Sequence, residues 1–172
     1  MGARNDKETS AMDTLRHARV TLPSDREIVI TRAFDAPRTV VFDAWTKAEH
    51  VAQWWDPNRV PLAVCEIDLR PDGAFRFVNQ GPDGLKHPFM GTYREIAAPE
   101  RLVFTTRLSP SGAESVGTLV FTEHEGRTIL TMTIACQSMA DRDTMLKIRI
   151  DVGTTRTLDN LDEYLGKLGR RG

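Results

Sequence analysis

Apolar residues change their spacing along this chain of 172 residues, and each spacing predicts a different kind of element. Residues 26–34 form a strand-like run that is rich in β-branched side chains. Apolar residues then recur at helical spacings of three and four, at Val41, Phe42, Trp45 and Ala48. Inside this region, Thr46 and Glu49 match a capping box. We therefore expect one strand and then two short helices that meet near Thr46, the second ending at Asp56-Pro57.

The region from residue 61 to residue 136 has the spacing of two that strands show, and turn sequences interrupt it. The turns lie at residues 70–73, 81–84, 97–100, 109–112 and 124–127. Because such short turns leave no room for a crossover helix, the six strands that they separate should be consecutive antiparallel neighbours. In one of these strands Met90 and Tyr93 fall on opposite faces, so its inward face is ambiguous.

After Ser138 the spacing becomes helical again and predicts one long amphipathic helix to the end of the chain. Gly153 lies inside this helix, where a glycine costs about 1 kcal/mol relative to alanine. Two explanations would account for it: close packing of the helix against another element, or a cavity beside the helix.

Together these elements predict an α+β protein with the helix-grip fold. A curved sheet of seven antiparallel strands would wrap around the long C-terminal helix, with the two short helices between the first and second strands. Residues 1–24 are polar and lack a clear period, so we expect a flexible N-terminal extension followed by a single domain over residues 25–172.

Several ordered motifs show a resemblance to a known family. They lie at residues 32–37, 41–46, 91–96, 99–105 and 158–161, with Glu49, Trp54 and Gly153 between them. Over about residues 26–168 the chain resembles the activator of heat-shock-protein-90 ATPase homologue-like proteins. This resemblance implies a START-like protein of the SRPBCC superfamily, whose members mostly hold a hydrophobic ligand between the sheet and the long helix.

The chain departs from the family pattern in two places. Thr154 stands where relatives commonly carry a tryptophan after the helix glycine, and Asp72-Gly73 stands where many carry two glycines. Without an indole at position 154 the cavity should be larger or wetter. The co-chaperone of the family also has an additional N-terminal domain, and residues 1–24 are too short to form it.

Composition and charge narrow the possible functions. The 23 basic and 24 acidic residues nearly cancel and no basic run occurs, so a nucleic-acid partner is not expected. No apolar stretch is long enough to span a membrane and the N-terminal residues lack a signal-peptide core, so we expect a cytoplasmic protein. Cys65 and Cys136 show no metal-ligand spacing and are interpreted as small buried residues. No cofactor and no metal are expected.

The adjacent residues Trp54 and Trp55 raise the question of a ligand site. Neighbouring side chains on a helix point about 100° apart, so both indoles cannot enter one core site. One should anchor the core, while the other either lies half exposed or borders a cavity. The candidate ligand-binding residues are Trp54, Trp55, Phe77, Tyr93, Phe104, Phe121, Met132, Met145 and Thr154. The aromatic and methionine residues among them could equally be plain core.

The leading hypothesis is a module that binds a small hydrophobic or amphipathic molecule, lipid- or polyketide-like, without covalent chemistry. The four histidines are scattered and no known catalytic motif occurs, so an enzyme is the less favoured reading. A cyclase or hydrolase would need an inward polar pair such as Tyr93 and Glu95, although Glu95 could instead form a surface ion pair. A co-chaperone-like module that docks a partner through an exposed indole is the third possibility. An exposed edge strand at residues 61–69 could pair two chains as a homodimer.

Overall fold

The computed structural model describes residues 2–107 and 112–171. The elements are α1 (Gly2–Thr14), β1 (Arg19–Thr21), β2 (Glu27–Phe34), α2 (Arg38–Thr46), α3 (Ala48–Trp54), β3 (Val64–Ile67), β4 (Ala74–Gln80), β5 (Lys86–Ala97), β6 (Arg101–Arg107), β7 (Glu114–His124), β8 (Arg127–Ala135), α4 (Met139–Lys147) and α5 (Ile150–Arg171). The turn expected at residues 109–112 lies almost entirely outside the described residues.

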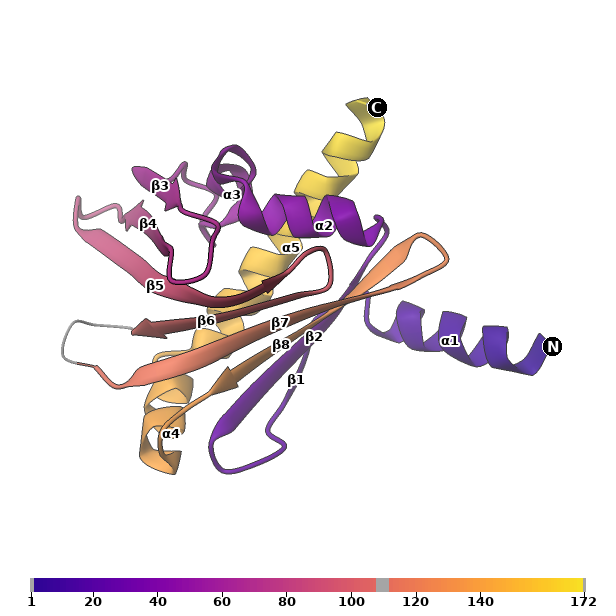
Figure 1. Ribbon diagram of the computed structural model, residues 1–172, viewed down its shortest axis with the longest axis horizontal. Helices are drawn as coiled ribbons and strands as arrows, with labels where there is room; N and C mark the ends of the chain where they lie inside the picture. Colours follow the sequence, from indigo (N-terminus) through magenta and orange to yellow (C-terminus); the bar gives the residue numbers. More distant parts are fainter. Residues whose placement is uncertain (1, 108–111, 172) are drawn as a thin grey trace.

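The strands form one antiparallel sheet in the order β1-β2-β8-β7-β6-β5-β4-β3. Figure 1 shows this sheet curving around α5, with α2 and α3 across one end and α4 at the other. The predicted α+β helix-grip fold and the antiparallel meander are therefore confirmed. The edge strands are β1 and β3.

The sheet has eight strands where the sequence predicted seven, and the additional strand is β1. It pairs with β2 so that Val20 faces Ile30. Its three residues are exposed, so no alternation of polar and apolar positions marks them in the sequence. The pairing places part of the expected N-terminal extension in the sheet, while the division of the chain at residue 24 stays a prediction.

Burial resolves the ambiguity of β5, and a β-bulge further along the strand accounts for the position of Glu95. Tyr93 is buried, Met90 is exposed, and the register against β6 shifts between Tyr93 and Glu95. The extra residue of a bulge changes which side chains point inward beyond it. Glu95 is accordingly exposed, with its carboxylate 3.3 Å from the Arg101 guanidinium.

The two short helices form as predicted, but the capping box does not. The Thr46 hydroxyl donates a hydrogen bond to the Phe42 carbonyl inside α2. Lys47 is the N-terminal cap of α3 and makes no side-chain capping bond. Because α2 extends through Thr46, that hydroxyl bonds back into its own helix and is not available to cap the next one.

The C-terminal segment is two helices, so the prediction of one continuous helix is wrong at one point. The chain breaks between α4 and α5, where Arg149 takes a left-handed conformation with φ of 61°. The apolar spacing continues through Met145, Ile148 and Val152. A single reversed residue leaves that spacing intact, and the sequence therefore carried no sign of the break.

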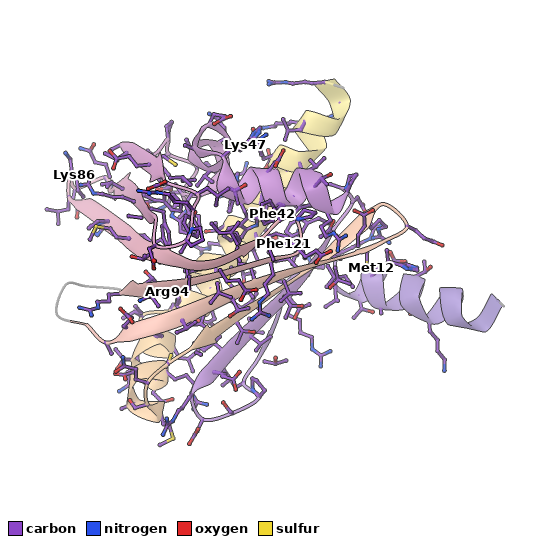
Figure 2. All side chains as sticks on the ribbon, viewed as in Figure 1. Met12, Phe42, Lys47, Lys86, Arg94 and Phe121 are labelled. Carbon is purple, nitrogen blue, oxygen red and sulfur yellow. The ribbon has the colours of Figure 1, made fainter. Side chains whose placement is uncertain are left out.

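The core lies between the sheet and the C-terminal half of α5. Leu158, Leu161 and Leu165 of α5 are buried together with Ile28 and Ile30 of β2. Near them, buried Arg32 of β2 forms ion pairs with Asp159 and Asp162 of α5. Figure 2 shows Phe42 and Phe121 meeting between α2 and the sheet, with ring centroids 5.5 Å apart. The leucines and the ion pairs hold α5 against the sheet, and the contact of Phe42 with Phe121 holds α2 against it.

Helix α1 contacts the domain at its C-terminal end. Met12 is only 3 % exposed and lies at the end of α1 nearest the sheet (Figure 2). The next residue, Asp13, lies 3.6 Å from the Arg127 guanidinium of β8. The rest of α1 extends away from the sheet (Figure 1).

Candidate ligand-binding cavity

A cavity of about 920 Å³ lies between the concave face of the sheet and the N-terminal half of α5. Its walls come from β6, β7 and β8, from α2, and from the junction of α4 with α5. The loop that follows α3 and the turn between β4 and β5 complete the rim. Ligand pockets of proteins commonly have volumes of roughly 300–1,000 Å³, so this cavity has room for a small molecule.

Several of the residues that line the cavity are small. Gly153 and Thr154 of α5 lie on one wall, and Ser115 and Gly117 of β7 lie on the other. A β-carbon added at Gly153 would have no atom within 4 Å, so this glycine is not required for close packing. Of the two explanations for Gly153, the structure therefore supports the cavity.

Gly117 has a different reason for being a glycine. A β-carbon there would lie 2.4 Å from two ring atoms of Phe104. Phe104 belongs to β6 and is the cross-strand partner of Gly117. Its ring therefore lies over the glycine and forms part of the cavity floor.

The two adjacent tryptophans have separate environments. Trp54 is 1 % exposed, donates a hydrogen bond from Nε1 to the Ala44 carbonyl, and packs against Trp45 with ring centroids 4.8 Å apart. Trp55 borders the cavity and packs against Phe77 and Phe89, with centroids 4.8 and 5.1 Å away. One indole therefore anchors the core while the other forms cavity wall.

The other candidate residues fall into three groups. Phe104, Met132, Met145 and Thr154 line the cavity together with Trp55. Phe77 and Tyr93 border a narrow adjacent hollow of about 20 Å³, which shares Trp45, Trp55, Phe89 and Phe104 with the cavity. Phe121 lies in the core beside Phe42 and does not line the cavity, and the same holds for Trp54.

Sequence reasoning missed the polar residues that hold the rim. Asn160 of α5 donates a hydrogen bond to the Asp56 carbonyl at 2.8 Å, and its side-chain oxygen accepts one from Arg59 at 3.2 Å. The Thr157 hydroxyl lies 2.9 Å from the Gly153 carbonyl and 3.3 Å from the Trp55 carbonyl, and its one hydrogen is shared between them. These bonds fix the chain after α3 to α5 and so position Trp55. A buried asparagine beside the apolar stripe of a helix was the available signal.

Asp56 is a second rim residue that the sequence suggested only as a helix stop. Its carboxylate is buried and accepts hydrogen bonds from the Asn79 side chain of β4 and, at 2.6 Å, from the Asn58 backbone. A carboxylate satisfied in this way orders the loop and joins it to the sheet. Two exposed rim residues, His87 and Arg149, complete the opening.

The positions of Tyr93 and Glu95 bear on the enzyme hypothesis. Burial, with a smaller contribution from Cys65, raises the pKa of Tyr93. Glu95 lies on the solvent face, so the inward pair of Tyr93 and Glu95 that the enzyme hypothesis required is absent. Burial raises the pKa of both cysteine thiols, that of Cys65 to about 11. In the described part of the chain, no three His, Cys, Asp or Glu side chains are arranged to hold a metal ion.

A curved antiparallel sheet that encloses an apolar cavity against its C-terminal helix defines a START-like, helix-grip protein. The chain belongs to the family described as activator of Hsp90 ATPase homolog 1-like proteins, whose model matches residues 35–166. This confirms the resemblance found in the motifs. None of the curated proteins matches the chain.

Solved structures share the fold over nearly their whole length. A protein from Rhodobacter sphaeroides superposes with a TM-score of 0.81 at 22% identity, covering 88% of this chain and 99% of its own. A protein from Nitrosomonas europaea gives 0.78 at 22% identity, covering 87% and 99%. A protein from Mycobacterium smegmatis gives 0.77 at 24% identity, covering 87% and 98%. At these identities the likeness establishes the fold alone. Across residues 2–107 and 112–171, no helix combines the length and hydropathy that crossing a membrane requires.

Proposed function

We propose that this protein binds a small hydrophobic or amphipathic molecule in the cavity between its sheet and α5, without covalent chemistry. The observation that carries the proposal is the cavity itself, about 920 Å³ and lined largely by apolar side chains. In a closely packed protein interior, few voids are larger than a water molecule. A space this large with largely apolar walls supports the proposal of a bound small molecule.

Apolar burial supplies the affinity in this proposal. Each methylene group that moves from water into an apolar site contributes about 0.8 kcal/mol. Trp55, Phe89, Phe104 and Met132 offer aromatic and thioether surface for this purpose. The rim bonds of Asn160 and Asp56 hold Trp55 in place before a ligand arrives, which reduces the ordering cost of binding.

Thr154→Trp tests the proposal by filling the cavity. The indole would project from the wall of α5 into open space, so we expect at least a ten-fold loss of affinity for the neutral dye N-phenyl-1-naphthylamine, measured by fluorescence titration. Melting temperature should change little. Arg156→Trp places the same indole on the exposed face of α5 and is the matched control.

The same protein can be examined for a natural occupant. Native mass spectrometry of the purified chain should show an additional mass of a few hundred daltons that disappears on denaturation. Failure of the wild-type protein to bind the dye, or equal dye binding by the wild type and Thr154→Trp, would exclude the cavity as a ligand site.

The co-chaperone alternative is weaker on this structure. It required an exposed indole for docking, but Trp45 and Trp54 are buried and Trp55 packs against Phe77 and Phe89. A cytoplasmic location and the pairing of two chains through edge strand β3 stay predictions.

A further inference from the structure

The pairing of β4 with β5 places two polar side chains at the cavity mouth. Phe77 of β4 faces Phe89 of β5, and two residues nearer to the turn Asn79 faces His87. Because side chains two apart on a strand point to the same face, Asn79 and His87 lie on the face that carries the two phenylalanines. Phe89, Asn79 and His87 all line the cavity. Along this strand pair the wall therefore changes from aromatic to polar toward the opening.

The amide of Asn79 is fixed in one orientation. Its Nδ2 donates to the carboxylate of Asp56, a residue of the loop after α3 that also lines the cavity. A carboxylate accepts and does not donate, so the amide nitrogen has to face Asp56 and the Oδ1 atom is left as an acceptor. Within residues 2–107 and 112–171, no group donates a hydrogen bond to this oxygen. Asn79 is partly exposed, so a molecule in the mouth can reach it.

The imidazole of His87 is accessible beside Asn79. His87 is exposed, and its ring makes no hydrogen bond to another residue of the described chain. Its Nε2 atom lies beside Gly81, 3.4 Å from where a β-carbon of that lining residue would be. Directly opposed residues of antiparallel strands have β-carbons about 4.5–5.5 Å apart. One small polar group can therefore contact both His87 and Asn79.

The charges at the mouth favour an uncharged head group on the ligand. Among the described lining residues, Asp56 and Arg149 carry formal charges. The Asp56 carboxylate is bonded to Asn79 itself, whereas Arg149 belongs to the junction of α4 with α5. An anionic head at Asn79 would therefore be repelled by the neighbouring carboxylate. A hydroxyl avoids this repulsion, because it donates to Asn79 Oδ1 and accepts from an imidazole N–H.

We propose that the ligand is an uncharged amphipathic molecule whose hydroxyl head group binds between Asn79 Oδ1 and the His87 imidazole. Its apolar body lies against Phe89, Phe104 and Met132, which line the cavity. This inference rests on the proposed binding function and specifies its ligand class. The apolar body supplies most of the affinity, and the hydroxyl sets the orientation of the ligand.

The probes 1-octanol and 1-chlorooctane test the head group, because they share one alkyl chain and the chloride does not donate a hydrogen bond. Their dissociation constants are measured by displacement of N-phenyl-1-naphthylamine. The ratio of the 1-chlorooctane constant to the 1-octanol constant should fall about five-fold in His87→Leu, because only the alcohol loses a hydrogen-bond partner. In the wild type, nuclear Overhauser effects should connect the His87 ring protons with the C1 methylene of bound 1-octanol and not with its terminal methyl group.

Lys86→Leu is the matched control, since it places the same side chain at the adjacent position of β5, outside the cavity lining (Figure 2). It should leave the ratio unchanged. An unchanged ratio in His87→Leu, or contact of the terminal methyl group with His87, would overturn this inference alone. So would octanoate that binds more tightly than 1-octanol at pH 8, because an anionic head at Arg149 would then be preferred. Absence of dye and probe binding by the wild type would overturn both this inference and the proposed function.

Discussion

Gly153 and Gly117 both border the cavity, yet substitution should affect them in opposite directions. Gly153→Ala meets open space and removes the entropic cost of a helical glycine, so the free energy of unfolding should rise by about 0.5–1 kcal/mol. Gly117→Ala would push its β-carbon into the Phe104 ring and should lower the free energy of unfolding. Urea denaturation of the two variants measures both. A loss of stability in Gly153→Ala would show that α5 packs closely there.

The pH dependence of Cys65 labelling tests whether this thiol is buried. Burial raises its pKa from 9.0 to about 11, and only the thiolate reacts with iodoacetamide. In a Cys136→Ala background, the labelling rate of the native protein should therefore inflect near pH 11. Cys65→Ala should abolish this phase, whereas an inflection near pH 9 would mean that the thiol is solvated.

The same shift has a consequence for stability. The folded-state pKa of Cys65 lies above its unfolded value, so the unfolded chain releases this proton first as the pH rises. The stabilising contribution is complete below pH 9 and is lost as the pH rises through 11. In Cys65→Ala, the free energy of unfolding should therefore fall less steeply between pH 9 and pH 11 than in the wild type.

The two tryptophans at the end of α3 should contribute differently, Trp54 to stability and Trp55 to ligand binding. Trp54 is buried and hydrogen-bonded, so Trp54→Ala should lower the free energy of unfolding by about 3–5 kcal/mol. Trp55→Ala enlarges a space that already exists, so it should cost less stability and weaken N-phenyl-1-naphthylamine binding several-fold. Thermal melting and dye titration of the two variants provide the comparison. Equal losses of stability with unchanged dye binding would assign both indoles to the core.

Helix boundaries show why elements were easier to predict than their ends. The apolar spacing of α2, α3 and α5 follows from which face each helix buries, and that spacing is visible in the sequence. The end of α2 depends on a single hydroxyl, since Thr46 bonds to Phe42 rather than capping α3. The break before α5 depends on one residue, Arg149, in a left-handed conformation. Local choices of this size do not change the pattern of apolar residues.

For the molecule as a whole, the N-terminal segment should be separable from the ligand site. Deletion of residues 1–17 removes α1, including the buried Met12 and the backbone hydrogen bond from Ala33 to Leu15. We expect the free energy of unfolding to fall by about 1–3 kcal/mol, the value of burying one large apolar side chain. Dye affinity should stay within two-fold of the wild type, because the cavity lining begins at Trp45.

Met12→Ser in the full chain is the control for this deletion. It should reproduce most of the stability loss, since Met12 is a buried side chain of α1. Loss of dye binding on deletion would contradict the expectation and would give the N-terminal segment a role in shaping the cavity.

The candidate site, like the fold, could be predicted only in part from the sequence. Trp55, Phe104, Met132, Met145 and Thr154 could be proposed from the sequence because inward positions of strands and helices follow from periodicity. The rim roles of Asn160 and Asp56 were not predicted, since they depend on hydrogen-bond partners that are distant in the chain. Trp54 and Phe121 lie in the core and are not among the residues that line the cavity, because an inward side chain can face either core or cavity.

Alternation, helical spacing and turn residues determined the order of elements and the helix-grip architecture, because each depends on neighbours within a few residues. The cavity was decided in three dimensions. Its walls bring together residues of β7 and α5, Ser115 and Gly117 with Gly153 and Thr154, which are distant in the chain. The hydrogen bonds of its rim likewise emerge only in the folded chain, because an asparagine or aspartate in a sequence has no assigned partner until the chain folds around it.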